Sequence, residues 1–286
     1  KPLVEALIRE ADVLIENFRT GAAESLGIGY AHARTLNPRL IWCAISGYGR
    51  SSPDAQRPGY DFVVQAESGL MSITGPVDGP PSKVGVATVD LATGLNAAIA
   101  ILAALHQRTR TGEGQHIELS LFEVQVQALA NIASSVLFTG EEARRYGNAH
   151  PTIVPYQSFD AADGMFALAC ASDHLWERLC TLLDRPQWID DPRCATNSAR
   201  VLHRDWLIPA LAACFAGATV AGWLTRFETA GIPAAPVNGV RDAVMGDLAT
   251  ARGLRIEDDG IPMIASPLRM SASPMRYVGP VMLSAA

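Results

Sequence analysis

The feature that most constrains the fold of this sequence is an alternation of short apolar runs and helical segments in its first half. Residues 12–16 and 40–46 are predicted strands, because each is a run of aliphatic side chains bounded by turn-forming residues. Between them, residues 22–26 and 30–36 have the apolar spacing of short helices. Strands and helices that alternate in this way typically build a parallel, doubly wound sheet. The sequence therefore predicts an α/β fold.

The character of the sequence changes after Gly147, where a new series of strand and helix patterns begins. We interpret residues 1–149 as a large domain and residues 150–235 as a smaller α/β domain. Residues 236–286 are predicted to be extended segments that return toward the large domain. A chain of 286 residues is long enough for this division.

Charge and apolar patterning limit the possible partners. Lys and Arg number 23 against 29 Asp and Glu, a formal net charge of −6, and no basic run is present, so we expect no nucleic acid partner. The longest nearly apolar stretch, residues 91–105, is shorter than a bilayer requires and contains Thr93 and Asn96. The sequence therefore predicts a core helix there and no membrane partner.

Five widely spaced cysteines without a CxxC pair indicate free thiols in a reducing compartment. No signal peptide precedes Lys1, so we expect a cytoplasmic protein. The sequence contains no GxSxG, GxGxxG or Walker A motif, which argues against a serine hydrolase or a classical nucleotide site. The six histidines show neither HxxxH nor HExxH spacing, so no metal site is expected.

The segment around Asp90 carries the most chemical information. Residues 84–89 read as an extended strand, and an apolar helix follows with Asp90 at the junction. One interpretation is a helix N-cap, a position that Asp favours. The other is a nucleophile, because the helix dipole and free amides at a helix start lower the pKa of a carboxyl group and keep it ionised. A carboxylate can form a mixed anhydride with an acyl-CoA. Position alone leaves both open.

A family resemblance favours the second interpretation. The sequence resembles the CaiB/BaiF, or class III, CoA-transferases, to which formyl-CoA:oxalate CoA-transferase and the α-methylacyl-CoA racemases are related. The resemblance covers nearly the whole chain through short motifs in a fixed order, namely Asp12–Arg19, Leu26-Gly27, Leu36–Ile41, Ser46–Gly49, Pro58–Asp61, Gln65-Ala66, Ser68–Met71, Lys83–Gly94, Thr111–Gln115, Asp190–Arg193 and Gly231–Pro233.

The resemblance implies a Rossmann-like large domain, a smaller α/β domain and an interlocked homodimer. It also implies roles for individual residues. Asp90 matches the catalytic aspartate, which would carry first the acyl group and then CoA. Asn17 and Phe18 match the loop that holds coenzyme A, and Arg19 beside them is suited to phosphate. The expected substrates are an acyl-CoA and a small carboxylic acid, with no metal.

The acyl pocket is expected from two segments. Tyr60 and Asp61 match a pair that lines it. Residues 147–151 fall where some members carry a mobile glycine-rich loop, which adds Gly147, Asn148 and His150 as pocket candidates. With one glycine here, the segment departs from that glycine-rich loop, and His150 is interpreted as structural or a pocket wall more than as a base. The identities of the donor and of the acceptor acid do not follow from the sequence.

Two departures from the family pattern matter. The family normally begins with an extra strand–helix segment before the position of Lys1, so we expect this chain to be part of a longer protein that completes the CoA cleft. The racemases place a His where this chain has Tyr60, and racemisation needs two acid/base groups that titrate near neutrality. A tyrosine is a poor choice for that task. Tyr60 therefore favours transfer over racemisation; a racemase and a non-catalytic CoA-binding homologue remain the alternatives.

Overall fold

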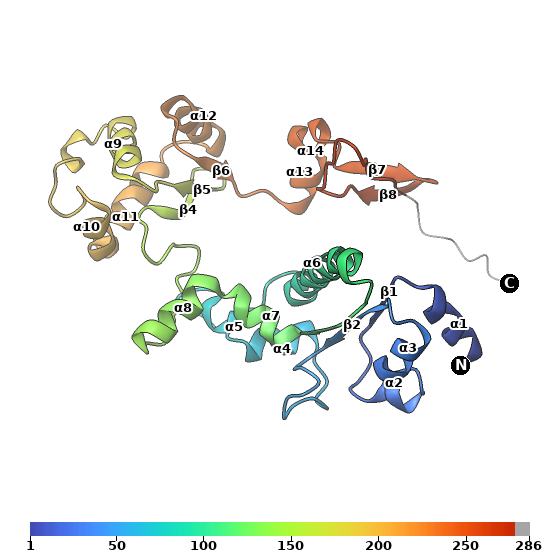
Figure 1. Cartoon of the computed structure of the whole chain (residues 1–286). Helices are drawn as coiled ribbons and strands as arrows, with labels where there is room; N and C mark the ends of the chain where they lie inside the picture. Colours follow the sequence, from blue (N-terminus) through green and yellow to red (C-terminus); the bar gives the residue numbers. More distant parts are fainter. Residues whose placement is uncertain (278–286) are drawn as a thin grey trace. The chain divides into compact units, whose positions relative to one another are not determined.

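The computed structural model describes residues 1–277. The chain divides into two compact units, residues 1–148 and the chain from residue 149 onward (Figure 1). Each unit has its own core and is described by itself. The predicted return of residues 236–286 to the large domain stays a prediction.

The first unit is built on a parallel sheet, as predicted. Strands β1 (Val13–Glu16), β2 (Ile41–Ser46) and β3 (His116–Ser120) pair in parallel in the order β1-β2-β3. Helix α1 (Pro2–Glu10) precedes β1. The connections between the strands contain helices α2 (Ala22–Ser25), α3 (Tyr30–Leu36), α4 (Asp61–Glu67), α5 (Leu70–Ile73) and α6 (Thr88–Thr111). Trp42 on β2 packs with the buried Ile8, Ala23 and Ala33, so α1, α2 and α3 cover one part of the sheet.

Helix α6 packs against β2 and β3, but it differs from the predicted core helix. It buries Val89, Thr93 and small alanines, whereas Leu91, Leu95, Ile99 and Leu102 are 61–68% exposed. With 24 residues, α6 is also longer than the helix that the apolar stretch at residues 91–105 predicted. Among the described residues it is the one unbent helix long and apolar enough to cross a bilayer, and two bent helix pairs pass the same test when each is joined. The large apolar side chains therefore lie on the face that this unit leaves uncovered.

Three other sequence predictions are wrong in detail. Residues 84–87 form no strand, and α6 already begins at Thr88. The sequence from about Glu123 to Phe138 predicts one long helix, whereas the structure has two, α7 (Leu121–Ala128) and α8 (Ala130–Thr139), bent by 80° where Ala130 adopts a positive φ of 49°. The tail beyond 236 contains helices α13 (Val240–Met245) and α14 (Asp247–Ala251) before the hairpin of β7 (Arg255–Asp258) and β8 (Ile261–Ile264).

The second unit holds the larger aromatic core. Strands β4 (Tyr156–Asp160), β5 (Met165–Ala169) and β6 (Ala234–Pro236) form an antiparallel sheet. Around it lie α9 (Asp173–Leu182), a 3₁₀ turn (Pro186–Trp188), α10 (Asn197–Leu202), α11 (Arg204–Phe215) and α12 (Val220–Ala230). Phe166, Phe215 and Phe227 meet with ring centroids 5.2–6.0 Å apart. All five cysteines are free thiols, as expected, and four of them are buried.

A backbone contact fixes the loop that leads from β2 to α4. Gly47 follows β2, Gly59 precedes α4, and a Cβ built on Gly59 would lie 2.4 Å from the Cα of Gly47. The two glycines thus bring the ends of the loop together at van der Waals distance and place Tyr60 and Asp61 beyond β2. Backbone on both sides of the contact leaves no flexible group to yield.

We expect Gly59→Ala to lower the free energy of unfolding by about 1–3 kcal/mol, because overpacked sites must displace their neighbours. Urea unfolding followed by circular dichroism measures this. Gly85→Ala is the matched control, since a Cβ there meets no atom within 4 Å. If both variants unfold at the same urea concentration, the close approach of the two glycines does not constrain the loop.

Candidate active site

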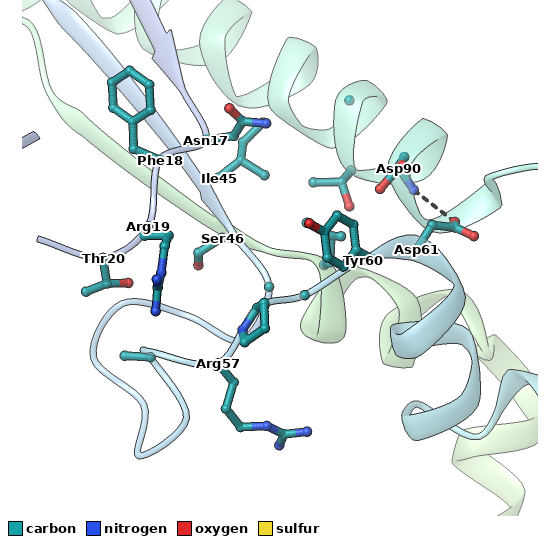
Figure 2. A pocket seen from close by; sticks show the side chains of 17 residues that line it. Asn17, Phe18, Arg19, Thr20, Ile45, Ser46, Arg57, Tyr60, Asp61 and Asp90 are labelled. Atoms are coloured by element: carbon teal, nitrogen blue, oxygen red, sulfur yellow. Dashed lines mark hydrogen bonds between the residues drawn. The ribbon is translucent and has the colours of Figure 1, made fainter. Parts of the chain in front are cut away.

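A pocket of about 530 Å³ lies where β1 and β2 end (Figure 2). The carboxyl ends of parallel strands are the usual place for ligands in open α/β sheets. The pocket brings together six residues that the sequence nominated, from three separate segments: Asn17, Phe18, Arg19, Tyr60, Asp61 and Asp90. It also contains residues that sequence reasoning missed, among them Thr20, Ser46, Arg57 and Thr93.

Asp90 is the third residue of α6 and lines the pocket with an exposed side chain (Figure 2). Its carboxylate is therefore reachable, as a nucleophile must be. The predicted direction of its pKa shift is wrong, however. Partial desolvation, followed by the negative charge of Asp61, raises the pKa of Asp90. The deprotonated form, which is the one that attacks, therefore becomes the major form of Asp90 at a higher pH than in an ordinary aspartate.

The expected free amides at the start of α6 are already used. Asp90 is not the N-cap; that position is Ala87, whose methyl group accepts no hydrogen bond. Instead the Oδ1 atom of Asp61 accepts from the amide of Val89 at 2.8 Å and from the amide of Asp90 at 3.4 Å. Asp61 thereby caps a helix that begins 27 residues later in the chain. The carboxylate of Asp61 therefore accepts hydrogen bonds from the backbone of α6, and the residue also lines the pocket.

The loop after β1 is held by a buried ion pair that sequence reasoning missed. Glu16, the last residue of β1, accepts a hydrogen bond from the amide of Phe18 at 2.9 Å and pairs with Arg50 at 2.7 Å. The side chains of Glu16 and Arg50 are 3% and 12% exposed. Arg50 also donates to the carbonyl of Phe18, and its backbone amide donates to Glu118 on β3. The signal in the sequence was the arginine that follows Gly47-Tyr48-Gly49 at the end of a strand.

Two arginines lie in the pocket, and they differ in availability. Arg57 binds Glu67 through two hydrogen bonds of 2.9 Å and stacks over Tyr48, and the hydrogen bonds to Glu67 raise its pKa. Within residues 1–277, the Arg19 guanidinium makes neither an ion pair nor a hydrogen bond. Arg19 is therefore the pocket cation left to meet an anionic ligand such as a phosphate.

The three remaining predicted pocket residues lie outside this cavity. Gly147 and Asn148 end the first unit, and His150 belongs to the second. His150 donates its amide to the carbonyl of Tyr156, and its Nδ1 accepts from the amide of Thr152 at 3.2 Å. These local contacts agree with a structural role for His150. The part of the chain that the structure describes contains no group of three His, Cys, Asp or Glu side chains placed to hold a metal ion.

Comparison with known protein families gives one decisive match. The model of CoA-transferase family III matches residues 1–281. The chain belongs to this family. The CoA-transferase resemblance inferred from short motifs is thereby confirmed.

Individual family members agree with this assignment. The chain is 42% identical to succinate–glutarate CoA-transferase of Agrobacterium fabrum over 97% of its own length and 71% of that protein. It is 41% identical to succinyl-CoA:glutarate CoA-transferase of Mus musculus, covering 89% of the chain and 58% of the relative. A solved CaiB/BaiF family protein from Brucella suis superimposes with a TM-score of 0.85 at 41% identity, over 96% of this chain and 73% of that one. The chain thus spans about three fifths to three quarters of the relatives it matches.

Proposed function

We propose that this protein transfers CoA from an acyl-CoA donor to a carboxylic acid acceptor, with Asp90 as the covalent carrier. The observation that carries the proposal is the exposed carboxylate of Asp90 inside a pocket at the carboxyl ends of a parallel sheet, in a chain of CoA-transferase family III. Arg19, without a protein partner among the described residues, supplies the charge for a CoA phosphate, and the loop of Asn17 and Phe18 holds the rest of the cofactor.

The proposed reaction exchanges one thioester for another. The ionised Asp90 attacks the thioester carbonyl of the donor, forms an aspartyl–acyl anhydride and releases the CoA thiolate. The thiolate then attacks the aspartyl carbonyl, releases the donor acid as a carboxylate and leaves an aspartyl-CoA thioester. The acceptor carboxylate attacks this thioester, and the same two steps run in reverse. Charge and atoms balance at each step without ATP or a metal.

We infer a short dicarboxylic acid as the acceptor class. The names of the Agrobacterium and mouse relatives specify succinate or succinyl-CoA, and glutarate. In such an acid one carboxylate enters the thioester while the other stays charged. Succinyl-CoA and glutarate are therefore the first donor and acceptor to assay, followed by monocarboxylic acids of equal length as the comparison.

The pocket favours transfer over racemisation for a chemical reason. Its described lining contains Tyr60 and no histidine, whereas proton abstraction and return at an α-carbon call for a pair of groups that titrate near neutrality.

The interlocked homodimer and the cytoplasmic location belong to the same proposal, and a family member acting on soluble CoA thioesters needs no membrane partner.

Trapping the covalent intermediate tests the proposed function. When the protein is incubated with succinyl-CoA and then treated with hydroxylamine, we expect an aspartyl hydroxamate on the proteolytic peptide that contains Asp90. Peptide mass spectrometry locates it. The peptide with Asp61 serves as the internal control, because the carboxylate of Asp61 is bound to amides. Turnover of glutarate with a hydroxamate on another peptide, or on none, would exclude Asp90 as the carrier, and a protein that binds CoA without any turnover would be the non-catalytic homologue.

A further inference from the structure

The nucleophile sits at the start of a helix whose own sequence supplies no cap. In the first turn of α6, the amide of Thr88 bonds the carbonyl of Val86 at 2.8 Å, and the amide of Leu91 bonds the carbonyl of Ala87 at 3.0 Å. The amides of Val89 and Asp90 lie between these two and have no backbone acceptor. Both point to the same atom, Oδ1 of Asp61, which begins α4.

The second oxygen of Asp61 is fixed as well. Gln65, one turn further along α4, donates its Nε2 to Oδ2 of Asp61 at 2.6 Å. The Gln65 side chain is fully buried, and its Oε1 accepts from the amide of Val84 at 2.9 Å. A fully buried amide that is bonded at both ends is held in one orientation. Gln65 therefore ties the start of the 84–90 segment to α4, while Asp61 ties its end.

Apolar packing makes this connection rigid. Val89 is completely buried and clusters with Val64 of α4 and Leu121 at the start of α7. Polar contacts from Asp61 and Gln65 thus flank an apolar contact from Val64 on the same short helix. All three act on the backbone immediately before Asp90, so α4 determines where the nucleophilic carboxylate lies.

We propose that Asp61 and Gln65 are positioning residues for the nucleophile, holding segment 84–90 and with it Asp90 at the edge of the pocket. This role differs from the acyl-pocket contact predicted for Asp61 from the sequence. The positioning role rests on the proposed function only for the statement that Asp90 is the reacting group. The contacts by which Asp61 and Gln65 hold residues 84–90 do not depend on that function. A displacement of about 1 Å at a reacting group can cost on the order of 100-fold in rate.

The charge of Asp61 gives the proposal a readout that a purely structural residue would lack. Four other titratable groups among the described residues line the pocket beside Asp90, namely Arg19, Arg57, Tyr60 and Asp61. Of these, Asp61 is the one whose charge raises the pKa of Asp90. Replacing Asp61 by Asn keeps an acceptor oxygen for the amide of Val89 and removes the negative charge, but it places an NH2 group opposite Nε2 of Gln65 and loses that hydrogen bond. The pKa of Asp90 then falls, and the acid limb of the rate profile moves to lower pH.

The test compares Asp61→Ala, Asp61→Asn and Gln65→Leu in the purified protein with succinyl-CoA and glutarate. We expect Asp61→Ala to lower kcat by about 10- to 100-fold with KM for both substrates within about threefold. Asp61→Asn should recover part of kcat, since the contact to the amide of Val89 remains while that to Gln65 is lost, and should shift the acid limb to lower pH. An Asp61→Ala variant with normal kcat, or with a raised KM for glutarate alone, would overturn the proposal, as would an Asp61→Asn variant as slow as Asp61→Ala.

Hydrogen exchange separates this proposal from the proposed function, because it needs no substrate. Asp61→Ala and Gln65→Leu should each raise the exchange rate of the peptide that covers residues 84–90 by at least about tenfold, while peptides from β2 and β3 keep theirs. Unchanged protection of residues 84–90 overturns the positioning role even in an active enzyme. Raised exchange in a protein that transfers no CoA supports the positioning role and rejects the proposed reaction instead.

Discussion

Asp90→Ala is expected to reduce CoA transfer by at least about 1,000-fold in kcat, because loss of a covalent nucleophile removes the whole reaction path. The other pocket carboxylate, Asp61, cannot replace it, since Oδ1 and Oδ2 of Asp61 are both engaged. Transfer from succinyl-CoA to glutarate, followed by chromatography of the CoA esters, measures the loss. Binding of CoA itself should change less than about threefold, because the expected phosphate contact at Arg19 is untouched.

A matched control separates lost chemistry from a damaged helix. Asp247 lies in the first turn of α14 and is exposed, as Asp90 is in α6. Asp247→Ala therefore loses the same favourable charge near a helix start and should keep normal transfer. Asp90→Asn, which preserves the size of the side chain, should be as inactive as Asp90→Ala. Substantial turnover in both Asp90 variants would place the nucleophile elsewhere.

Arg50→Met is expected to lower the free energy of unfolding by about 3–5 kcal/mol, because it leaves the carboxylate of Glu16 buried without its cation. Glu16 is 3% exposed, so water cannot take the place of the guanidinium. The same change frees the carbonyl of Phe18 from Arg50 and loosens the loop that carries Arg19. Urea unfolding measures the loss of stability. Because the loop that carries Arg19 is loosened, the KM for succinyl-CoA should rise in the same variant.

An exposed ion pair supplies the control for this prediction. Arg34 and Glu113 are 3.8 Å apart with side chains 58% and 69% exposed, and such pairs contribute little. Arg34→Met should change the free energy of unfolding by less than about 0.5 kcal/mol. The double variant Glu16→Gln/Arg50→Met should recover part of the loss, because no charge is then left buried. Equal stability of Arg50→Met and Arg34→Met would show that the buried pair does not hold the loop.

The sequence predicted the elements whose signals are local. The runs at 13–16 and 41–46 are strands because their apolar residues sit beside turn residues, and residues 116–120, which alternate between polar and apolar as a strand does, form the third. The parallel order follows from the helices between them. Asp90 was found in the same way, from its place after an apolar segment and before a helix, together with the resemblance. Glycine spacing at 112–115 also had a local cause: Gly112 ends α6 at φ 77°, and a Cβ on Gly114 would overlap the carbonyl of Leu40.

What the sequence could not provide depends on contacts between distant residues. The start of α6 was misplaced because its cap is Asp61, which no local pattern connects to Thr88. The pKa direction of Asp90 was wrong for the same reason: the predicted free amides are taken, and a second carboxylate lies beside it. The break between α7 and α8 was missed because Ala130 adopts a positive φ without a Gly or Pro to announce it.

The contact between Gly47 and Gly59 has a consequence for how this scaffold can diversify. A stretch of chain pinched at its base transmits little change from its tip to the rest of the molecule. Of the residues beyond that pinch, Arg50 is anchored to Glu16, and Arg57 to Glu67. Asp54 pairs with Arg57, and Gln56 donates to the carbonyl of Thr20. Residues 51–53 are therefore the natural place for insertions, deletions or a randomised library, because changes there leave Tyr60, Asp61 and Asp90 in their places.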